Sequence, residues 1–178
     1  MFFNELYIFI LRVCTRIKTE WKVFLIFLVI FLFVYIVFRI RRRKCNFTTI
    51  LKSVLIAYVA CLFVSMVFSR HGRDYYQLEL RPLHSYCELF VGHKEYLVQN
   101  MMNIVAFIPV GLIFSVLEKR YMLAFFSGVG ISLLIELLQL IMMKGVFEID
   151  DIINNAVGTL IGVLITFVIL RLKGRRID

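Results

Sequence analysis

Long apolar stretches separated by short charged segments dominate the pattern of hydrophobic and polar positions along this chain. A helix needs about 20 mainly apolar residues to cross a bilayer. Each of five stretches reaches or approaches that length and stops at a polar loop or a basic cluster. The sequence therefore predicts an all-α protein, a polytopic transmembrane helix bundle with about five spans. The expected spans are 23–40, 50–68, 97–117, 121–143 and 152–170.

The segment before the first long stretch is too short to form a further span. Its roughly dozen apolar-leaning residues fit an N-terminal interfacial helix better. A cleaved signal peptide carries small residues and a cleavage site after its apolar stretch. Here a basic cluster stands at that position, so we do not expect cleavage. The expected organisation is an interfacial segment at 1–22, two N-terminal spans joined by a basic loop at 23–68, an outer loop at 69–96, a three-helix core at 97–170 and a basic tail at 171–178.

Composition agrees with a membrane protein. Hydrophobic residues make up 61% of the 178 residues, and the mean hydropathy is +0.88. The net charge of +9 fits loops that set topology and touch lipid headgroups, so membrane lipids are expected partners and nucleic acid is not. The four cysteines are scattered and form no CxxC pair, so neither a disulfide scaffold nor a zinc knuckle is indicated.

Orientation follows from the densest basic cluster, Arg39 together with 41–44. Short basic loops stay on the cytoplasmic side of a membrane. With five spans, the N-terminus is then outside, the C-terminus is cytoplasmic, and the segments 69–96 and 144–151 face outward.

Several polar residues interrupt the last three expected spans. Ser132, Glu136 and Gln139 are spaced four and three apart, which places them on one helix face. Glu136 and Asn103 each fall about 9 to 10 Å below the outer end of their helices. The sequence predicts one polar pocket at this level, open toward the outside. An ionisable residue in a span is a candidate functional residue, so Glu136 leads this set.

The acidic pair Asp150 and Asp151 has two interpretations. Both residues come just before the last apolar stretch, where an aspartate can cap a helix and complement its dipole. Capping explains one aspartate readily and the second less well. A role in the pocket, together with Asn155, is the other interpretation.

The outer loop has a composition of its own. Tyr76, Leu80, Leu83, Tyr86 and Phe90 predict a half-buried interfacial segment. The loop also contains histidine, cysteine and glutamate residues, but without HExxH or a comparable spacing no metal ligands are assigned.

Three blocks give the chain a family resemblance: NIVAFIPVG at 103–111, SLLIELLQ at 132–139 and FEIDDIINNAVGTLIG at 147–162. In order and spacing they resemble the VanZ-like family, whose namesake is linked to resistance against the glycopeptide teicoplanin. The resemblance implies a multi-pass protein of the bacterial cytoplasmic membrane and a characteristic acidic pair matched by Asp150 and Asp151. One position departs from the pattern: Gly145, preceded by Lys144, stands where family members commonly carry arginine.

Two functions remain open. The first is a cell-envelope protein of antibiotic resistance whose outer-leaflet pocket binds a lipid-linked wall precursor or a lipoglycopeptide. The expected ligand-binding residues are Asn103, Glu136, Gln139, Asp150, Asp151 and Asn155. The alternative is a membrane-embedded enzyme acting on a polyprenyl-linked phosphate or sugar.

For the enzyme, the candidate catalytic residues are Glu136, Asp150 and Asp151, working as an acid–base pair or through a bound cation. The sequence identifies no cofactor. A transporter is disfavoured because the inner halves of the last three spans are almost wholly apolar. Gly158 and Gly162 predict a close helix contact and are compatible with a homo-oligomer.

Overall fold

The computed structural model describes residues 33, 35–37, 47–68, 74–118 and 120–174. Its elements are α2 (Phe47–Phe63), the π-helical turn η1 (Val64–Phe68), β1 (Leu78–Glu79), α3 (His84–Val91), α4 (Glu95–Glu118), α5 (Tyr121–Ile141), β2 (Phe147–Glu148) and α6 (Ile149–Leu172). The expected interfacial segment at 1–22 and nearly all of the expected span at 23–40 lie outside the described residues, so a fifth span stays a prediction.

Four helices of the described part are long and apolar enough to cross a membrane: Phe47–Val67, Glu95–Glu118, Tyr121–Ile141 and Ile149–Leu172. They confirm an all-α, multi-pass membrane protein. The last span was predicted to begin at residue 152, and that boundary was wrong. The helix begins at Ile149, directly after the extended residue Glu148. Asp150 and Asp151 therefore lie in its first turn and not in a preceding loop.

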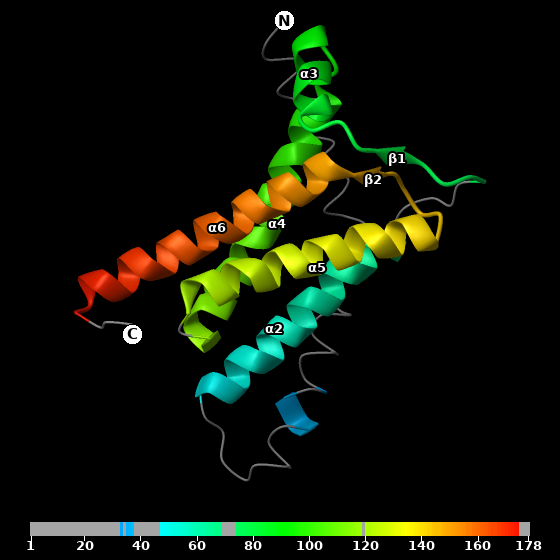
Figure 1. Ribbon diagram of the computed structural model, residues 1–178. Coiled ribbons are helices and arrows are strands. Elements are labelled where there is room, and N and C mark those ends of the chain that lie inside the picture. The colour runs from blue at the N-terminus through cyan, green and yellow to red at the C-terminus, as the bar shows by residue number, and fades with distance from the viewer. Residues whose placement is uncertain (1–32, 34, 38–46, 69–73, 119, 175–178) are drawn as a thin grey trace, which may run out of the picture.

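Among the described helices, the closest contact joins α4 and α6, which cross in Figure 1. A methyl group on Gly158 would overlap the carbonyl oxygen of Ile104, and one on Gly162 would overlap that of Ile108. On the facing helix, a methyl group on Gly111 would overlap the carbonyl oxygen of Thr159. Small residues let helix backbones approach in a membrane, so the predicted contact at Gly158 and Gly162 is confirmed, and it forms within one chain.

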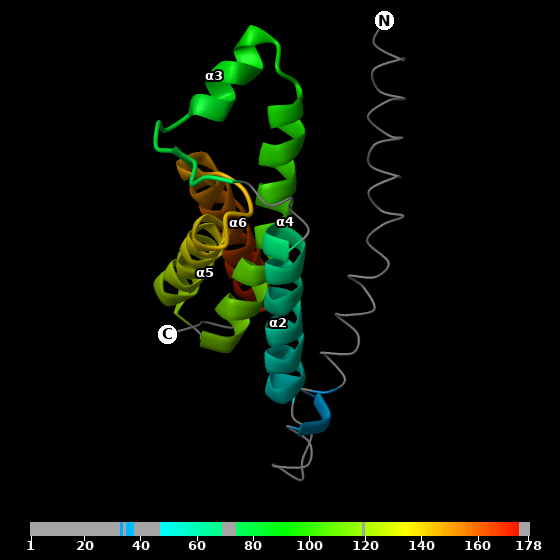
Figure 2. The ribbon, with the colours of Figure 1, turned by 90° about the vertical axis from the view of Figure 1, so that its right-hand side faces the viewer.

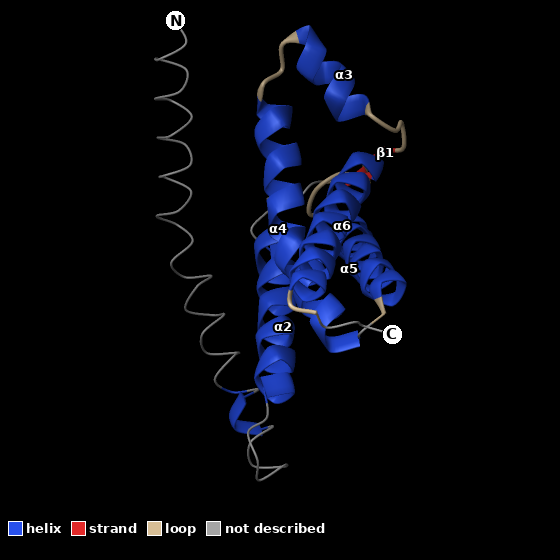
Figure 3. Ribbon diagram, turned by 90° about the vertical axis from the view of Figure 1, so that its left-hand side faces the viewer, coloured by secondary structure: helices blue, strands red, loops and turns tan. Residues whose placement is uncertain are grey.

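The helix α2 packs against α4, and the views in Figures 2 and 3 show the two side by side. The Tyr58 hydroxyl donates a hydrogen bond of 2.8 Å to the carbonyl of Ala106. The buried apolar core between the helices consists of Leu62, Val67, Phe107, Val110 and Ile135.

The connections at one end of the bundle form a small structure of their own. The strands β1 and β2 pair in parallel, with Leu78 opposite Phe147 and Glu79 opposite Glu148. The next element, α3, lies beside the first turn of α6 and leads into the top of α4 (Figures 1 and 2). This places residues 74–94 over the end of the bundle where α6 begins.

Candidate functional site

Buried polar side chains gather at the end of the bundle covered by residues 74–94. They come from α3, α4, α5 and α6, although the sequence separates them by many residues. Its buried members, each hydrogen-bonded to another member or to a neighbouring backbone group, are Ser85, Asn100, Asn103, Ser132, Glu136, Gln139, Asp150, Asp151, Asn154 and Asn155. We call this set the polar cluster. All six predicted site residues belong to it.

Asp151 connects α6 to α4. Its Oδ1 accepts a hydrogen bond of 2.6 Å from the Asn103 amide and one of 3.2 Å from the Gln99 amide. Gln99 Nε2 also donates to a carboxylate oxygen of Glu148 at 3.2 Å. Asp151 is only 1% exposed, so these charge-assisted hydrogen bonds replace water around a buried carboxylate.

Glu136 connects α5 to the start of α6. Its Oε2 accepts a hydrogen bond of 3.1 Å from the backbone N–H of Glu148. One turn deeper, Asn155 Nδ2 donates to Ser132 Oγ at 2.8 Å. Because α5 and α6 run in opposite directions, Glu136 and Asp151 each lie one turn outward from this pair. The two carboxylates therefore occupy the same level of the bundle.

Asp150 connects α6 to α3. Its two oxygens accept hydrogen bonds from the backbone N–H of Leu83 at 2.6 Å, and from the N–H and hydroxyl of Ser85, both at 2.7 Å. These amides belong to the first turn of α3, where backbone donors lack partners within the helix. Asp150 therefore does cap a helix, as one interpretation expected, but the capped helix is α3 and not α6.

A chain of amides extends this contact. The Asn100 amide donates to Ser85 Oγ at 3.1 Å, and the Asn154 amide donates to Asn100 Oδ1 at 3.0 Å. The Tyr86 hydroxyl donates to Asn154 Oδ1 at 2.6 Å. Burial raises the pKa of Tyr86, and the charge of Asp150 raises it further. The hydroxyl therefore keeps its proton and remains a donor.

Two buried amide oxygens have no hydrogen-bond partner in the described part of the chain: Gln139 Oε1 and Asn155 Oδ1. The side-chain Nε2 of Gln139 donates a hydrogen bond of 3.0 Å to the carbonyl of Met66 in the π-helical turn η1. Buried polar atoms without partners are uncommon, and each invites a water molecule or a ligand donor. The polar cluster thus has unused acceptors at two of its predicted site residues.

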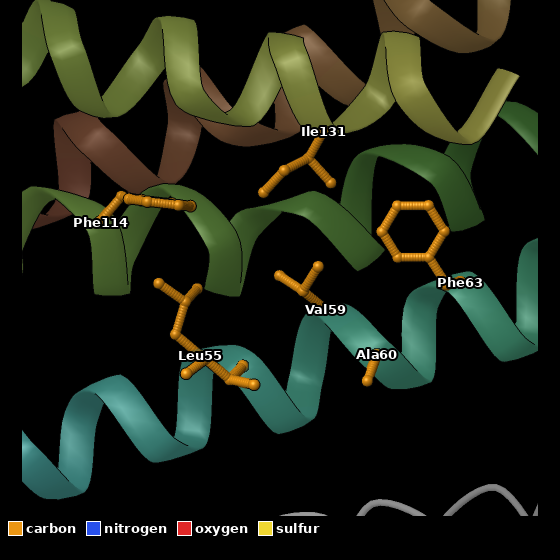
Figure 4. Close-up of a pocket in the computed structure, with 7 residues that line it drawn as sticks. Leu55, Val59, Ala60, Phe63, Phe114 and Ile131 are labelled. Carbon is orange, nitrogen blue, oxygen red and sulfur yellow. The ribbon is translucent and has the colours of Figure 1, made fainter. Parts of the chain in front are cut away.

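The structure brings the predicted residues together but buries them. Glu136 is 1% exposed and Gln139 is 0% exposed, so the open pocket stays a prediction. A separate, apolar cavity of about 390 Å³ lies between α2, α4 and α5 and is lined by residues including Leu55, Phe63 and Ile131 (Figure 4). It carries no polar group of the cluster.

The contributors outside the six predicted site residues are Ser85, Tyr86, Gln99, Asn100, Ser132, Glu148 and Asn154. Gln99 lies one turn before Asn103, so helical spacing from Asn103 could have identified it. Tyr86 was predicted to face the membrane interface and instead points toward α6. The partners of Ser85 and Glu148 depend on chain segments that only the fold brings together.

The three candidate catalytic carboxylates contact different elements: Glu136 contacts β2, Asp150 contacts α3, and Asp151 contacts α4. Among the described residues, no three His, Cys, Asp or Glu side chains are grouped so that they could hold a metal ion. The cation-dependent form of the enzyme hypothesis stays a prediction.

The departure at Gly145 has a backbone reason. Gly145 adopts a φ of 135°, a conformation that residues with a side chain rarely adopt. The preceding residue, Lys144, donates its backbone N–H to the Gln139 carbonyl at 2.8 Å and closes the end of α5. An arginine at 145 would strain this turn, so the glycine fits the loop as this chain builds it.

Four apolar spans and a buried polar cluster at one end define a multi-pass helical membrane protein. The profile of the VanZ/LLP1 family matches residues 23–171, and the chain belongs to that family. The match confirms the resemblance carried by the three sequence blocks. No curated protein and no solved structure matches the chain.

Proposed function

We propose that this VanZ/LLP1 protein binds the head group of a lipid-linked wall precursor or a lipidated glycopeptide at the polar cluster, and that this binding contributes to teicoplanin resistance. The proposal places the cluster in the outer leaflet of a bacterial cytoplasmic membrane, with the N-terminus outside and the C-terminus cytoplasmic. Asn103, Glu136, Gln139, Asp151 and Asn155 are the proposed ligand-binding residues. Asp150 acts with them by holding α3 in place.

The observation that carries the proposal is the pair of unpartnered acceptors, Gln139 Oε1 and Asn155 Oδ1, inside a buried cluster. A ligand that supplies hydrogen-bond donors would satisfy them. Sugars and peptides, the head groups of wall precursors and of glycopeptides, are rich in hydroxyl and amide donors. The acidic residues Glu136 and Asp151 add acceptor character at the same level of the bundle.

A susceptibility test in cells separates binding from folding. Cells expressing Glu136→Gln or Asp151→Asn should lose teicoplanin tolerance while the protein stays at normal membrane abundance. The matched control is Glu118→Gln, the same change at an exposed residue at the far end of α4, which should keep tolerance. If the cluster variants tolerate teicoplanin as well as the wild type does, the proposal is wrong.

Impermeant thiol labelling in intact cells tests the orientation. One single-cysteine version carries Asp74→Cys at an exposed position of the segment 74–94. A second retains Cys45, and a third carries only an engineered Glu148→Cys. Labelling of the engineered thiols at 74 and 148, but not of Cys45, would support an outward-facing cluster. Labelling of Cys45 alone would show that the protein has the opposite orientation, and the proposal of an outer-leaflet ligand would be wrong.

A further inference from the structure

The short helix α3 has an apolar face that no described residue covers. Leu83, at its N-cap, is 52% exposed, and Phe90 and Val91 are 92% and 76% exposed. Cys87 is also exposed. The four positions are spaced by four, three and one residues, so they form a single stripe along the helix.

The opposite side of α3 is polar and faces the protein. Ser85 is 2% exposed and bonds to Asp150, while Tyr86 bonds to Asn154. A helix on a water-soluble domain directs its apolar stripe inward and its polar face outward. Here the order is reversed, as it is for a helix that lies along a membrane surface.

The neighbouring segments extend the apolar surface on both sides of α3. Leu78 and Leu80, in and beside β1, are 52% and 55% exposed. After α3, only three residues separate Val91 from Glu95, where the spanning helix α4 begins. Leu97 and Met101, in the first two turns of α4, are 47% and 48% exposed, as expected of side chains that face lipid.

Ionisable groups near the stripe lie close to one another. Arg81 Nε lies 2.9 Å from a carboxylate oxygen of Glu79, and His84 lies 3.5 Å from the other oxygen of Glu79. Glu88 lies between His84 and His93, at 3.9 Å and 3.5 Å. These groups form a polar edge beside the apolar stripe, an arrangement suited to the boundary between headgroups and acyl chains.

We infer that α3 lies in the membrane interface, with Leu83, Cys87, Phe90 and Val91 inserted among the lipids at the end of the bundle where α6 begins. The occupant of this face is membrane lipid and not a second copy of the chain, because the stripe leads directly into the lipid-facing side of α4. The inference does not depend on the proposed ligand. It places a lipid-embedded helix directly over the polar cluster, since its other face is bonded to Asp150 and Asn154.

Fluorescence quenching in reconstituted vesicles tests the inference. The full chain, with Cys14, Cys45 and Cys61 replaced, is labelled at Cys87 with an environment-sensitive fluorophore. A second variant lacks Cys87 and carries Phe90→Cys. The matched control also lacks Cys87 and carries Glu88→Cys. Position 88 is on the same helix, next to position 87, but lies on the polar edge. The vesicles contain phosphatidylcholine and phosphatidylglycerol, with or without acyl chains brominated near the headgroup, and iodide is supplied on both sides.

The labels at 87 and 90 should be quenched severalfold more by brominated lipid than by iodide, and the label at 88 should show the reverse preference. Because brominated lipid and iodide reach both sides, this result does not depend on how the protein is oriented. Quenching of the label at 87 by iodide alone would place the stripe in water. Protection from both quenchers, with oxidative cross-linking of Cys87 between copies, would assign the face to a second copy. Either result overturns the inference.

Discussion

Asn103 on α4 donates a hydrogen bond of 2.6 Å to Asp151 on α6, across 48 positions of sequence. Both side chains are buried, and the two helices touch through Gly111 and Gly158. The close backbone contact brings the amide within reach of the carboxylate, and the hydrogen bond in turn compensates part of the cost of burying a charge. Among the described helices, the most tightly packed pair thus supports the most polar region.

A double-mutant cycle should detect this hydrogen bond. Asn103→Ala and Asp151→Ala, made singly and together, should show a coupling of about 1.5–3 kcal/mol in the free energy of unfolding, the range for hydrogen bonds to charged groups. Unfolding in detergent, followed by circular dichroism, measures it. Asn103→Ala combined with Glu118→Ala, a distant pair, should be additive. Additivity of the first pair as well would show that the hydrogen bond contributes nothing to stability.

Removing the carboxylate of Asp150 should loosen α3. Asp150→Ala leaves the N–H groups of Leu83 and Ser85 without their acceptor, and loss of a cap costs about 0.5–2 kcal/mol. Limited trypsin digestion should then cut faster after Lys94 than in the wild type. Asp74→Ala, a change at an exposed acidic residue, provides the comparison. Equal cutting rates for Asp150→Ala and wild type would show that other contacts hold α3.

Glycine substitutions should separate packed from open positions. Gly158→Ala would drive a methyl group into the Ile104 carbonyl, so membrane abundance and thermal stability should fall sharply. Gly130→Ala is the matched control, because nothing lies near its added methyl group. Alanine there should stabilise the helix by up to about 1 kcal/mol, as helix propensity predicts. Similar losses at both positions would contradict the contact between α4 and α6.

The ion pair of Glu79 and Arg81 should persist in acid. Hydrogen bonds from Arg81 lower the pKa of Glu79 to about 2 from its ordinary value of 4.5. A lowered pKa in the folded state means that the contribution to stability is fully present above 4.5 and is lost as the pH falls toward 2. Carboxyl signals in a nuclear magnetic resonance titration should show Glu79 still ionised at pH 4.

The same titration of Arg81→Ala tests whether Arg81 is the group that lowers the pKa of Glu79. Without the guanidinium, the pKa of Glu79 should return toward its ordinary value. High salt should reduce the difference in the Glu79 pKa between the wild type and Arg81→Ala, because the ion pair is at the surface. An unchanged pKa in Arg81→Ala would mean that another group lowers it.

Much of the fold could be predicted from sequence because membrane spans are local features. The length of an apolar stretch decides whether it can cross a bilayer, and a spacing of three or four decides which side chains share a helix face. Both are local properties of the sequence. We could therefore predict four of the spans, the family, and the helix face shared by Ser132, Glu136 and Gln139. The close contact at Gly158 could be predicted for the same reason.

Tertiary structure alone decided how the polar residues are connected. Asp150 and Asp151 are adjacent in sequence, yet one bonds to Leu83, 67 positions away, and the other to Asn103, 48 positions away. Consecutive residues on a helix point about 100° apart, so neighbours face different elements once the bundle assembles. The sequence by itself determined which groups are polar and which of them share a helix face. Their partners and the capping of α3 by Asp150 of α6 depend on contacts between distant segments, and no local pattern encodes those.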